Sequence, residues 1–167
     1  MLEKVVSGGQ SGVDRAALDA ARAAGLACGG WCPRDRWAED GPIAASYPLT
    51  ETPQRDPAQR TAWNVRDADA TLVLARGAPR GGTAFTVECA RAEGRPCSVV
   101  DLESGADATQ IARWIQRSGV RVLNVAGPRE SQAPGIHADA FALLREVLSA
   151  ALQAPRGEGP GPPGTSR

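Results

Sequence analysis

The chain has little of several residue types on which particular functions depend. Its 167 residues include one histidine, one tyrosine and four cysteines, and the only lysine is Lys4. The formal net charge is zero, so the composition does not indicate a surface for nucleic acid. No apolar run is long enough to cross a bilayer, and the N-terminus lacks a signal-peptide pattern. We therefore expect neither nucleic acid nor a membrane as a partner.

The cysteines do not suggest a metal centre. None of them forms a C-x-x-C pair, and the only histidine is His137. A zinc site needs a better-spaced set of ligands, so no metal ligands are assigned. Reduced core thiols are the expected state, which implies a cytoplasmic location. Cys32 is the exception to examine, because its predicted place in a loop would allow contact with a ligand.

Arginine supplies almost all of the positive charge. Its planar guanidinium suits phosphate and other oxyanions. Codon bias in a GC-rich genome is the favoured explanation, because alanine, glycine and proline are also abundant. Only arginines that lie beside glycine-containing turns are therefore counted as evidence for a site.

Short apolar strands alternate with amphipathic helices along most of the chain. This pattern predicts an α/β fold: a single Rossmann-like domain over residues 1–152, with a mostly parallel sheet of about five strands and helices on both faces. Strands are predicted at about 4–7, 27–31, 71–75, 96–102 and 120–125. Three predicted helices end at a glycine just before a strand, at Gly25, Gly94 and Gly119. Residues 153–167 are rich in proline and glycine and are predicted to form a disordered tail.

A long segment, residues 32–57, interrupts this alternation. It is rich in proline and too long for an ordinary connection, which indicates a function. Trp37 and Tyr47 within it could stack on a planar ligand or on a neighbouring subunit, although plain packing is the simpler interpretation for each. Asp56 followed by Pro57 has the form of a helix start.

The stretch from Ser7 to Asp19, SGGQSGVDRAALD, follows the first strand and opens a helix. Its glycines allow a tight turn and a close approach of the backbone to a ligand. Ser11 is the predicted N-cap, with Asp14 completing a variant of the capping box. Free N–H groups at such a helix start form an anion site, while the alternative is a plain capped turn. The candidate binding residues here are Gly8, Gly9, Gln10, Ser11 and Gly12.

Two further turns follow predicted strands. Because ligands bind at the carboxyl ends of parallel strands, all three turns converge if the first, third and fifth strands are near neighbours. Each later turn alone is also explained by ordinary loop chemistry, but the three together indicate an anionic or nucleotide-like ligand. The candidate residues of the second turn and its helix are Arg80, Gly81, Gly82, Thr83 and Thr86. Those of the third turn are Gly127, Arg129 and Ser131.

Motifs for common nucleotide chemistry are absent. The chain has neither G-x-G-x-x-G nor G-K-[ST], which disfavours dinucleotide-dependent hydride transfer and P-loop hydrolysis. Among the acids, Asp14 is explained as a cap, Glu39 with Asp40 as part of a solvated loop, and Glu88 as facing the site or complementing a helix dipole. No serine or cysteine nucleophile can be assembled around His137. No catalytic residue is assigned, and binding is easier to support than catalysis.

Several motifs, taken in order, resemble those of the molybdenum cofactor carrier family. They are SGGQSGVDRAALDAA, GGWCPRDRWAEDG, YPLTET, RTAWNVRDADATLVL, RGGTAFTVE and LNVAGPRES..PGI, and they span about Val5 to Leu148. That family belongs to a wider Rossmann-like group that includes the "lonely guy" phosphoribohydrolases. The resemblance implies that the chain binds, stores and hands over molybdenum cofactor or molybdate. It also implies a homo-oligomer, a dimer or tetramer, that meets a molybdoenzyme or a cofactor-synthesis protein.

The phosphoribohydrolase relatives carry P-G-G-x-G-T-x-x-E, which this chain matches only in part. The glycine pair and Glu88 align, but Arg80 replaces the proline and Ala84 replaces the third glycine. The threonine falls one place late, at Thr86. This departure puts cleavage of nucleoside monophosphates in doubt. An enzyme of that kind, or a sensor of a nucleotide-derived ligand, stays as the alternative to a carrier.

Overall fold

The structure, a computed structural model, describes residues 1–153, so the predicted tail lies outside the described residues apart from Gln153. Its main sheet has five strands, all parallel, in the order β2-β1-β7-β5-β6. The strands are β1 (Lys4–Val6), β2 (Ala27–Gly29), β5 (Ala70–Ala75), β6 (Cys97–Asp101) and β7 (Val122–Ala126). The sheet confirms the predicted α/β class and the predicted number of strands.

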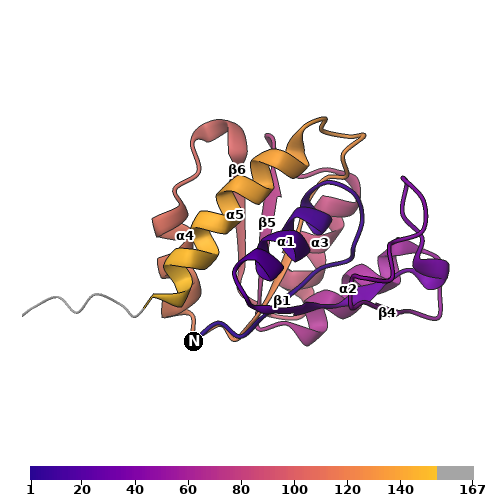
Figure 1. Cartoon of the computed structure of the whole chain (residues 1–167), viewed down its shortest axis with the longest axis horizontal. Helices are drawn as coiled ribbons and strands as arrows, with labels where there is room; N and C mark the ends of the chain where they lie inside the picture. Colours follow the sequence, from indigo (N-terminus) through magenta and orange to yellow (C-terminus); the bar gives the residue numbers. More distant parts are fainter. Residues whose placement is uncertain (154–167) are drawn as a thin grey trace, which may run out of the picture.

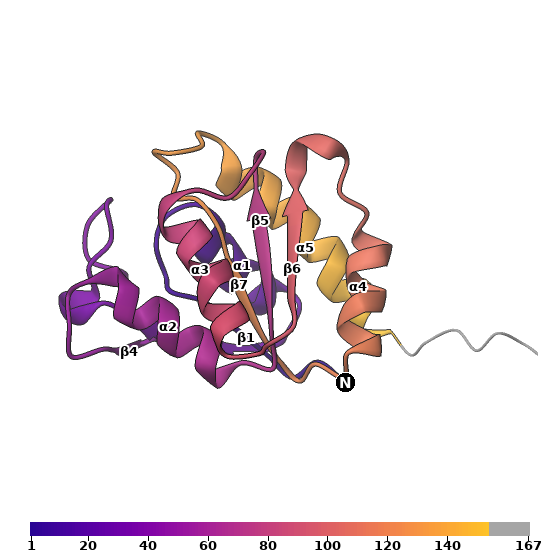
Figure 2. The ribbon, with the colours of Figure 1, turned by 180° about the vertical axis from the view of Figure 1, so that it is seen from behind.

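Helices cover both faces of this sheet (Figures 1 and 2). One face carries α1, α4 and α5, with α5 packed against both of the others, and the other face carries α2 and α3. Their bounds are α1 (Val13–Ala23), α2 (Pro57–Asp67), α3 (Gly81–Ala92), α4 (Ala108–Arg117) and α5 (Ile136–Leu152). Within residues 1–153 no helix is long and apolar enough to span a membrane.

Most of the predicted helix ends are confirmed. Gly25, Gly94 and Gly119 have positive φ angles of 71°, 61° and 63°, the backbone conformation that glycine adopts at low cost after a helix. The side chain of Asp56 accepts the N–H of Ala58 at 2.9 Å, so this aspartate caps α2 as expected.

The predicted start of α1 is wrong in one respect. The N-cap is Gly12, with φ 79°, and no side chain caps the helix, so Ser11 is not the N-cap. Gly12 lies against the backbone of the third turn, where a Cβ would collide with the carbonyl of Pro128. The close approach of two backbones, rather than capping chemistry, therefore fixes this residue as glycine.

The second predicted strand divides in two. β2 ends at Gly29, and Gly30, with φ 122°, turns the chain so that β3 (Trp31–Cys32) leaves the main sheet. β3 pairs with β4 (Thr50–Glu51) in a small parallel sheet. The side chain of Asn64, on α2, holds this bend by bonding both the N–H and the carbonyl of Trp31, at 2.8 and 2.9 Å.

The core has one large and one small part. The large part lies between the sheet and α1, α4 and α5, and every residue of β5 is buried, as a central parallel strand requires. The small part lies beneath the chain between β3 and β4. This connection, residues 33–49, is called the strap below, and it includes the short 3₁₀ helix η1 (Arg34–Arg36). Its buried apolar residues are Ala38, Ile43 and Leu49, which pack on Leu18 and Cys32.

Candidate functional site

The three glycine turns meet at one edge of the sheet. β7 pairs with β1 on one side and with β5 on the other, so the turns that follow these strands are neighbours, as predicted. Most of the predicted binding residues line one cavity of about 320 Å³, called the α3 cavity here. They are Gln10, Gly81, Gly82, Thr83, Thr86, Gly127 and Arg129.

The N-terminus of α3 opens directly on this cavity. Its N-cap, Arg80, provides no capping side chain, and nothing lies within 4 Å of where a Cβ on Gly81 or Gly82 would be. The first backbone N–H groups of a helix lack partners inside the helix and carry its positive dipole end. Thr83 and Thr86 are buried beside them, and the Thr86 hydroxyl donates to the carbonyl of Gly82 at 3.0 Å. This helix start is a geometry suited to an anion.

A second cavity, of about 470 Å³, adjoins the first and is called the proline cavity here. The two share Gly81, Thr83 and Gln132 in their walls. Alanine and proline side chains make up much of the remaining wall, together with Arg76 and Arg80. Together the two cavities provide a helix N-terminus at α3 and an adjoining space walled by alanine, proline and arginine side chains.

The first turn binds an anion of its own. The carboxylate of Asp14, whose side chain is 3% exposed, accepts the N–H of Gln10 at 3.4 Å and is paired with Arg60. Burial is the dominant influence on this group and raises the pKa of Asp14, against the opposing effects of Arg60 and of the N–H groups of Gln10 and Gly127. Asp14 is therefore not part of a capping box. It fills the position at the helix start where a ligand anion was expected.

Two further donors of the first turn also have partners inside the chain. The N–H of Ser11 donates to the side chain of Gln10 at 3.0 Å, and the N–H of Val13 donates to the carbonyl of Pro128 at 3.2 Å. Gly8 lies against the guanidinium of Arg60, and Gly9 lies beneath the strap. The turn is thus built into the protein interior, and only Gln10 of the predicted set reaches the α3 cavity from it.

Arg60 is a residue of the α3 cavity that the sequence analysis did not identify. It comes from α2, its Nη1 lies 3.0 Å from Oδ2 of Asp14, and its buried Nε has no hydrogen-bond partner. One signal could have found this pair. Asp14 lies on the apolar face of a helix between Val13 and Ala16, and a carboxylate at such a position needs a cation.

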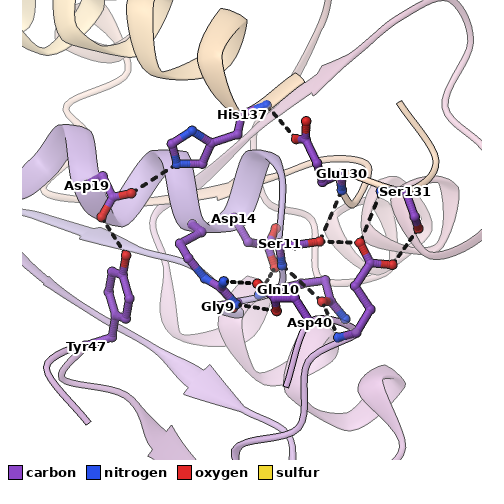
Figure 3. A network of polar contacts seen from close by, with 12 residues as sticks. Gly9, Gln10, Ser11, Asp14, Asp19, Asp40, Tyr47, Glu130, Ser131 and His137 are labelled. Atoms are coloured by element: carbon purple, nitrogen blue, oxygen red, sulfur yellow. Dashed lines mark hydrogen bonds and ion pairs between the residues drawn. The ribbon is translucent and has the colours of Figure 1, made fainter. Parts of the chain in front are cut away.

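Glu39 and Asp40 of the strap are predicted to lie in a solvated loop, but Glu39 in fact connects the turn after β1 to the turn after β7. The Glu39 carboxylate accepts hydrogen bonds from the Ser11 hydroxyl and from the N–H and hydroxyl of Ser131. Figure 3 shows Ser11 and Ser131 close together although they come from the turns after β1 and β7. Partial burial alone would raise the pKa of Glu39, but these bonds outweigh it and lower the pKa. Asp40 is paired with Arg15.

Glu39 and Asp40 line a third cavity, of about 610 Å³. Of the predicted binding residues, Ser11, Gly12 and Ser131 also line it. Most of the predicted binding residues are therefore divided between this cavity and the α3 cavity, while Arg80 lines the proline cavity and Gly8 and Gly9 line none of the three. Arg129 stands between the third cavity and the α3 cavity, because it lines the α3 cavity while its Nη1 lies 3.8 Å from Glu39.

The half-buried side chain of Tyr47 contacts other residues of the same chain. Its hydroxyl donates to Asp19 at 2.8 Å, and Nε2 of His137 lies 3.0 Å from the other carboxylate oxygen of Asp19 (Figure 3). Its ring lies near the guanidiniums of Arg15 and Arg22. The tyrosine thus fastens the strap to α1, so packing is the interpretation that the structure supports.

Cys32 and Glu88, which the sequence suggested as possible ligand contacts, do not lie in the site. Cys32 lies in β3 and is fully buried, and burial raises the pKa of its thiol, so it is a core residue and not a loop thiol. Glu88 is exposed on α3 and does not line the three cavities described above. Within residues 1–153 no group of three histidine, cysteine or acidic side chains is placed to hold a metal ion.

Comparison with known proteins agrees with this fold and topology. A crystal structure of a putative molybdenum carrier protein from Syntrophus aciditrophicus SB is 36% identical and superposes with a TM-score of 0.81, covering 91% of this chain and 96% of that one. None of the curated proteins compared gives a significant match. Residues 5–148 match the family described as circularly permutated YpsA SLOG. The chain therefore belongs to the circularly permuted YpsA branch of the SLOG family.

Proposed function

We propose that the chain binds a small anionic ligand at the start of α3, and that this ligand is molybdenum cofactor or molybdate. The observation that carries the proposal is the uncapped N-terminus of α3, where Gly81 and Gly82 face a cavity that Arg60 and Arg129 also line. Backbone N–H groups, a helix dipole and guanidiniums are the donors that phosphate and other oxyanions take.

The adjoining proline cavity supports a ligand larger than a free oxyanion. Molybdenum cofactor is a pterin that carries a phosphate and a molybdenum oxide held by a dithiolene. Its phosphate suits the α3 helix start, and its organic part suits the apolar side chains of Ala78, Pro79 and Pro134 in the adjoining wall. Small-molecule sites typically have volumes of about 300–1,000 Å³, and both cavities, at 320 and 470 Å³, fall in that range.

The likeness to a protein described as a molybdenum carrier supports molybdenum as the cargo. On this proposal the chain stores the cofactor in the cytoplasm, protects it from oxidation and hands it to a molybdoenzyme or takes it from a synthesis protein. It acts as a homo-oligomer, a dimer or tetramer. On this proposal the anion-binding loops hold the cargo by hydrogen bonds and charge, without covalent chemistry.

The first experiment is to purify the protein anaerobically from a host that makes the cofactor. Molybdenum is measured by elemental analysis, and pterin by its fluorescence after oxidation. We expect both, near one per subunit. Molybdenum without pterin would replace the cofactor by molybdate as the ligand. A folded protein with neither would contradict the carrier function, and a screen of nucleoside monophosphates would then test the alternative ligands.

A further inference from the structure

Glu39 occupies donors that an external anion would use. Its carboxylate accepts the Ser11 hydroxyl, the Ser131 N–H at 3.1 Å and the Ser131 hydroxyl at 2.5 Å, and it lies 3.8 Å from Nη1 of Arg129. Ser11, Arg129 and Ser131 are residues that the sequence marked as anion-binding. The Glu39 carboxylate is thus an internal oxyanion that already occupies these anion-binding residues.

A carboxylate and a phosphate or molybdate group make the same kind of contact with these donors. Each presents negatively charged oxygens that accept hydrogen bonds from hydroxyl, N–H and guanidinium groups. The donors can serve only one of them at a time. Because Glu39 also offsets the charge of Arg129, it weakens the attraction of the α3 cavity for an anion.

The backbone on either side of Glu39 has conformations that can act as hinges. Before it, Asp35 and Arg36 have φ angles of 63° and 51°, which are uncommon for residues other than glycine and are often found at switch regions. After it, Gly41 has φ 110° with open space around it. The segment from Trp37 up to and including the second hinge, residues 37–41, is called the tip of the strap.

The rest of the strap is anchored independently of the tip. The guanidinium of Arg36 donates to the carbonyls of Ile43 and Tyr47 at 2.8 and 2.9 Å, and it also reaches those of Ala44 and Leu49. Apart from burial of Ala38 and partial burial of Trp37, the tip is held by polar contacts: those of the Glu39 carboxylate, an ion pair between Asp40 and Arg15, and a 2.9 Å bond from the Glu39 N–H to Gln10. The tip can therefore shift while the strap stays in place.

We propose that Glu39 is an internal competitor: an oxyanion that binds to Ser11, Arg129 and Ser131 displaces its carboxylate and moves the tip of the strap. The proposal rests on the proposed function through Arg129, which lines the α3 cavity and pairs with Glu39, whereas Ser11 and Ser131 line the neighbouring third cavity. It makes the strap an autoinhibitory element that sets how tightly the cargo is held and when it is released.

Calorimetric titration with molybdate and, separately, with inorganic phosphate tests the competition. Glu39→Gln keeps the shape of the side chain but loses its charge, so we expect both anions to bind about tenfold more tightly, the factor by which charged hydrogen bonds exceed neutral ones. Glu39→Asp, which keeps the charge, should remain within about threefold of the wild type. Glu146→Gln, on the exposed face of α5, is the matched control for the charge change. Unchanged or weaker binding by Glu39→Gln overturns the proposal.

Hydrogen–deuterium exchange of the tip, residues 37–41, gives a second measurement that does not depend on affinity. Molybdate should accelerate exchange of the Glu39 amide, which is bonded to Gln10, in the wild type, whereas Glu39→Gln should exchange quickly without it. Protection of the strap by molybdate overturns the competition. If the wild type binds anions and loses them with Gly82→Val while Glu39→Gln changes nothing, only this inference fails. If no variant binds either anion, the proposed function fails with it.

Discussion

Arg60 and Asp14 form an ion pair beneath the first glycine turn. Nη1 of Arg60 lies 3.0 Å from Oδ2 of Asp14, and the two side chains are 13% and 3% exposed. The pair joins the start of α1 to α2 across Gly8, whose missing side chain leaves room for the guanidinium. An internal ion pair thus supports the edge of the sheet where the α3 cavity opens.

Arg60→Met should destabilise the protein strongly. Removing one partner leaves the Asp14 carboxylate buried without a counter-charge, a change that costs about 3–5 kcal/mol at neutral pH. Urea unfolding at pH 7 measures the loss. The double variant Arg60→Met with Asp14→Asn should recover much of it, because no charge is then buried. A loss equal to the sum of the two single changes would contradict the pairing.

The stability of Arg60→Met should also depend on pH in a defined direction. Burial already raises the pKa of Asp14, and without Arg60 nothing but N–H groups opposes it. A carboxyl with a raised pKa in the folded state stabilises the fold below its unfolded pKa, and that contribution is lost as the pH rises through the folded pKa. The deficit relative to the wild type should therefore be smaller at pH 5 than at pH 7. An equal deficit at both values would show that Asp14 is not the cause.

The fold was predictable because its signals are local. The buried run of β5, the glycines after three helices and the Asp56 cap each report on their own element, and each is confirmed. The bend at Gly30 was missed because it depends on distant partners: the backbone of Ser7 and the side chain of Asn64. Nothing near Gly30 in the sequence identifies those contacts.

The site was harder to predict because two internal carboxylates take part in it. The convergence of the turns follows from strand order, and the sequence anticipated it on the condition that β1, β5 and β7 are neighbours. The local pattern around Asp14 and Glu39 suggested a cap and a solvated loop. Their real partners, Arg60 and Ser131, lie 46 and 92 residues away in the chain. Contacts between residues so far apart in the chain produce no local sequence pattern from which they could be predicted.

Gly82→Val should weaken ligand binding without disturbing the fold. A Cβ at this position meets no protein atom within 4 Å, so the side chain would extend into space that the proposed ligand uses. We expect a loss of binding with a change in unfolding free energy of only about 0.5–1 kcal/mol, the range for helix propensity. Loading with molybdenum and pterin, together with urea unfolding, measures both. Full loading of a folded variant would remove the start of α3 from the site.

Arg129→Ala should reduce affinity for the anion by about 1.5–3 kcal/mol, the range for a hydrogen bond to a charged group. Arg129 lines the α3 cavity and its side chain is 37% exposed, so it is available to a ligand. Arg117→Ala, at the exposed end of α4, is a control that removes the same charge elsewhere. Titration with molybdate compares the three proteins. Equal affinity in all of them would exclude Arg129 from the site.

Tyr47→Phe should change how stability responds to alkaline pH. Burial, followed by the hydrogen bond to Asp19, raises the pKa of Tyr47 from 10.0 to about 12. The unfolded chain therefore loses this proton first, and the stabilisation present below about pH 10 is lost as the pH rises towards 12. At pH 8 the variant should be less stable by about 0.5–1.5 kcal/mol, the net value of one hydrogen bond. Between pH 10 and 12 the wild type should lose more stability than the variant, so the two unfolding curves should converge. Curves that stay parallel across that range would show that Tyr47 does not fasten the strap through Asp19.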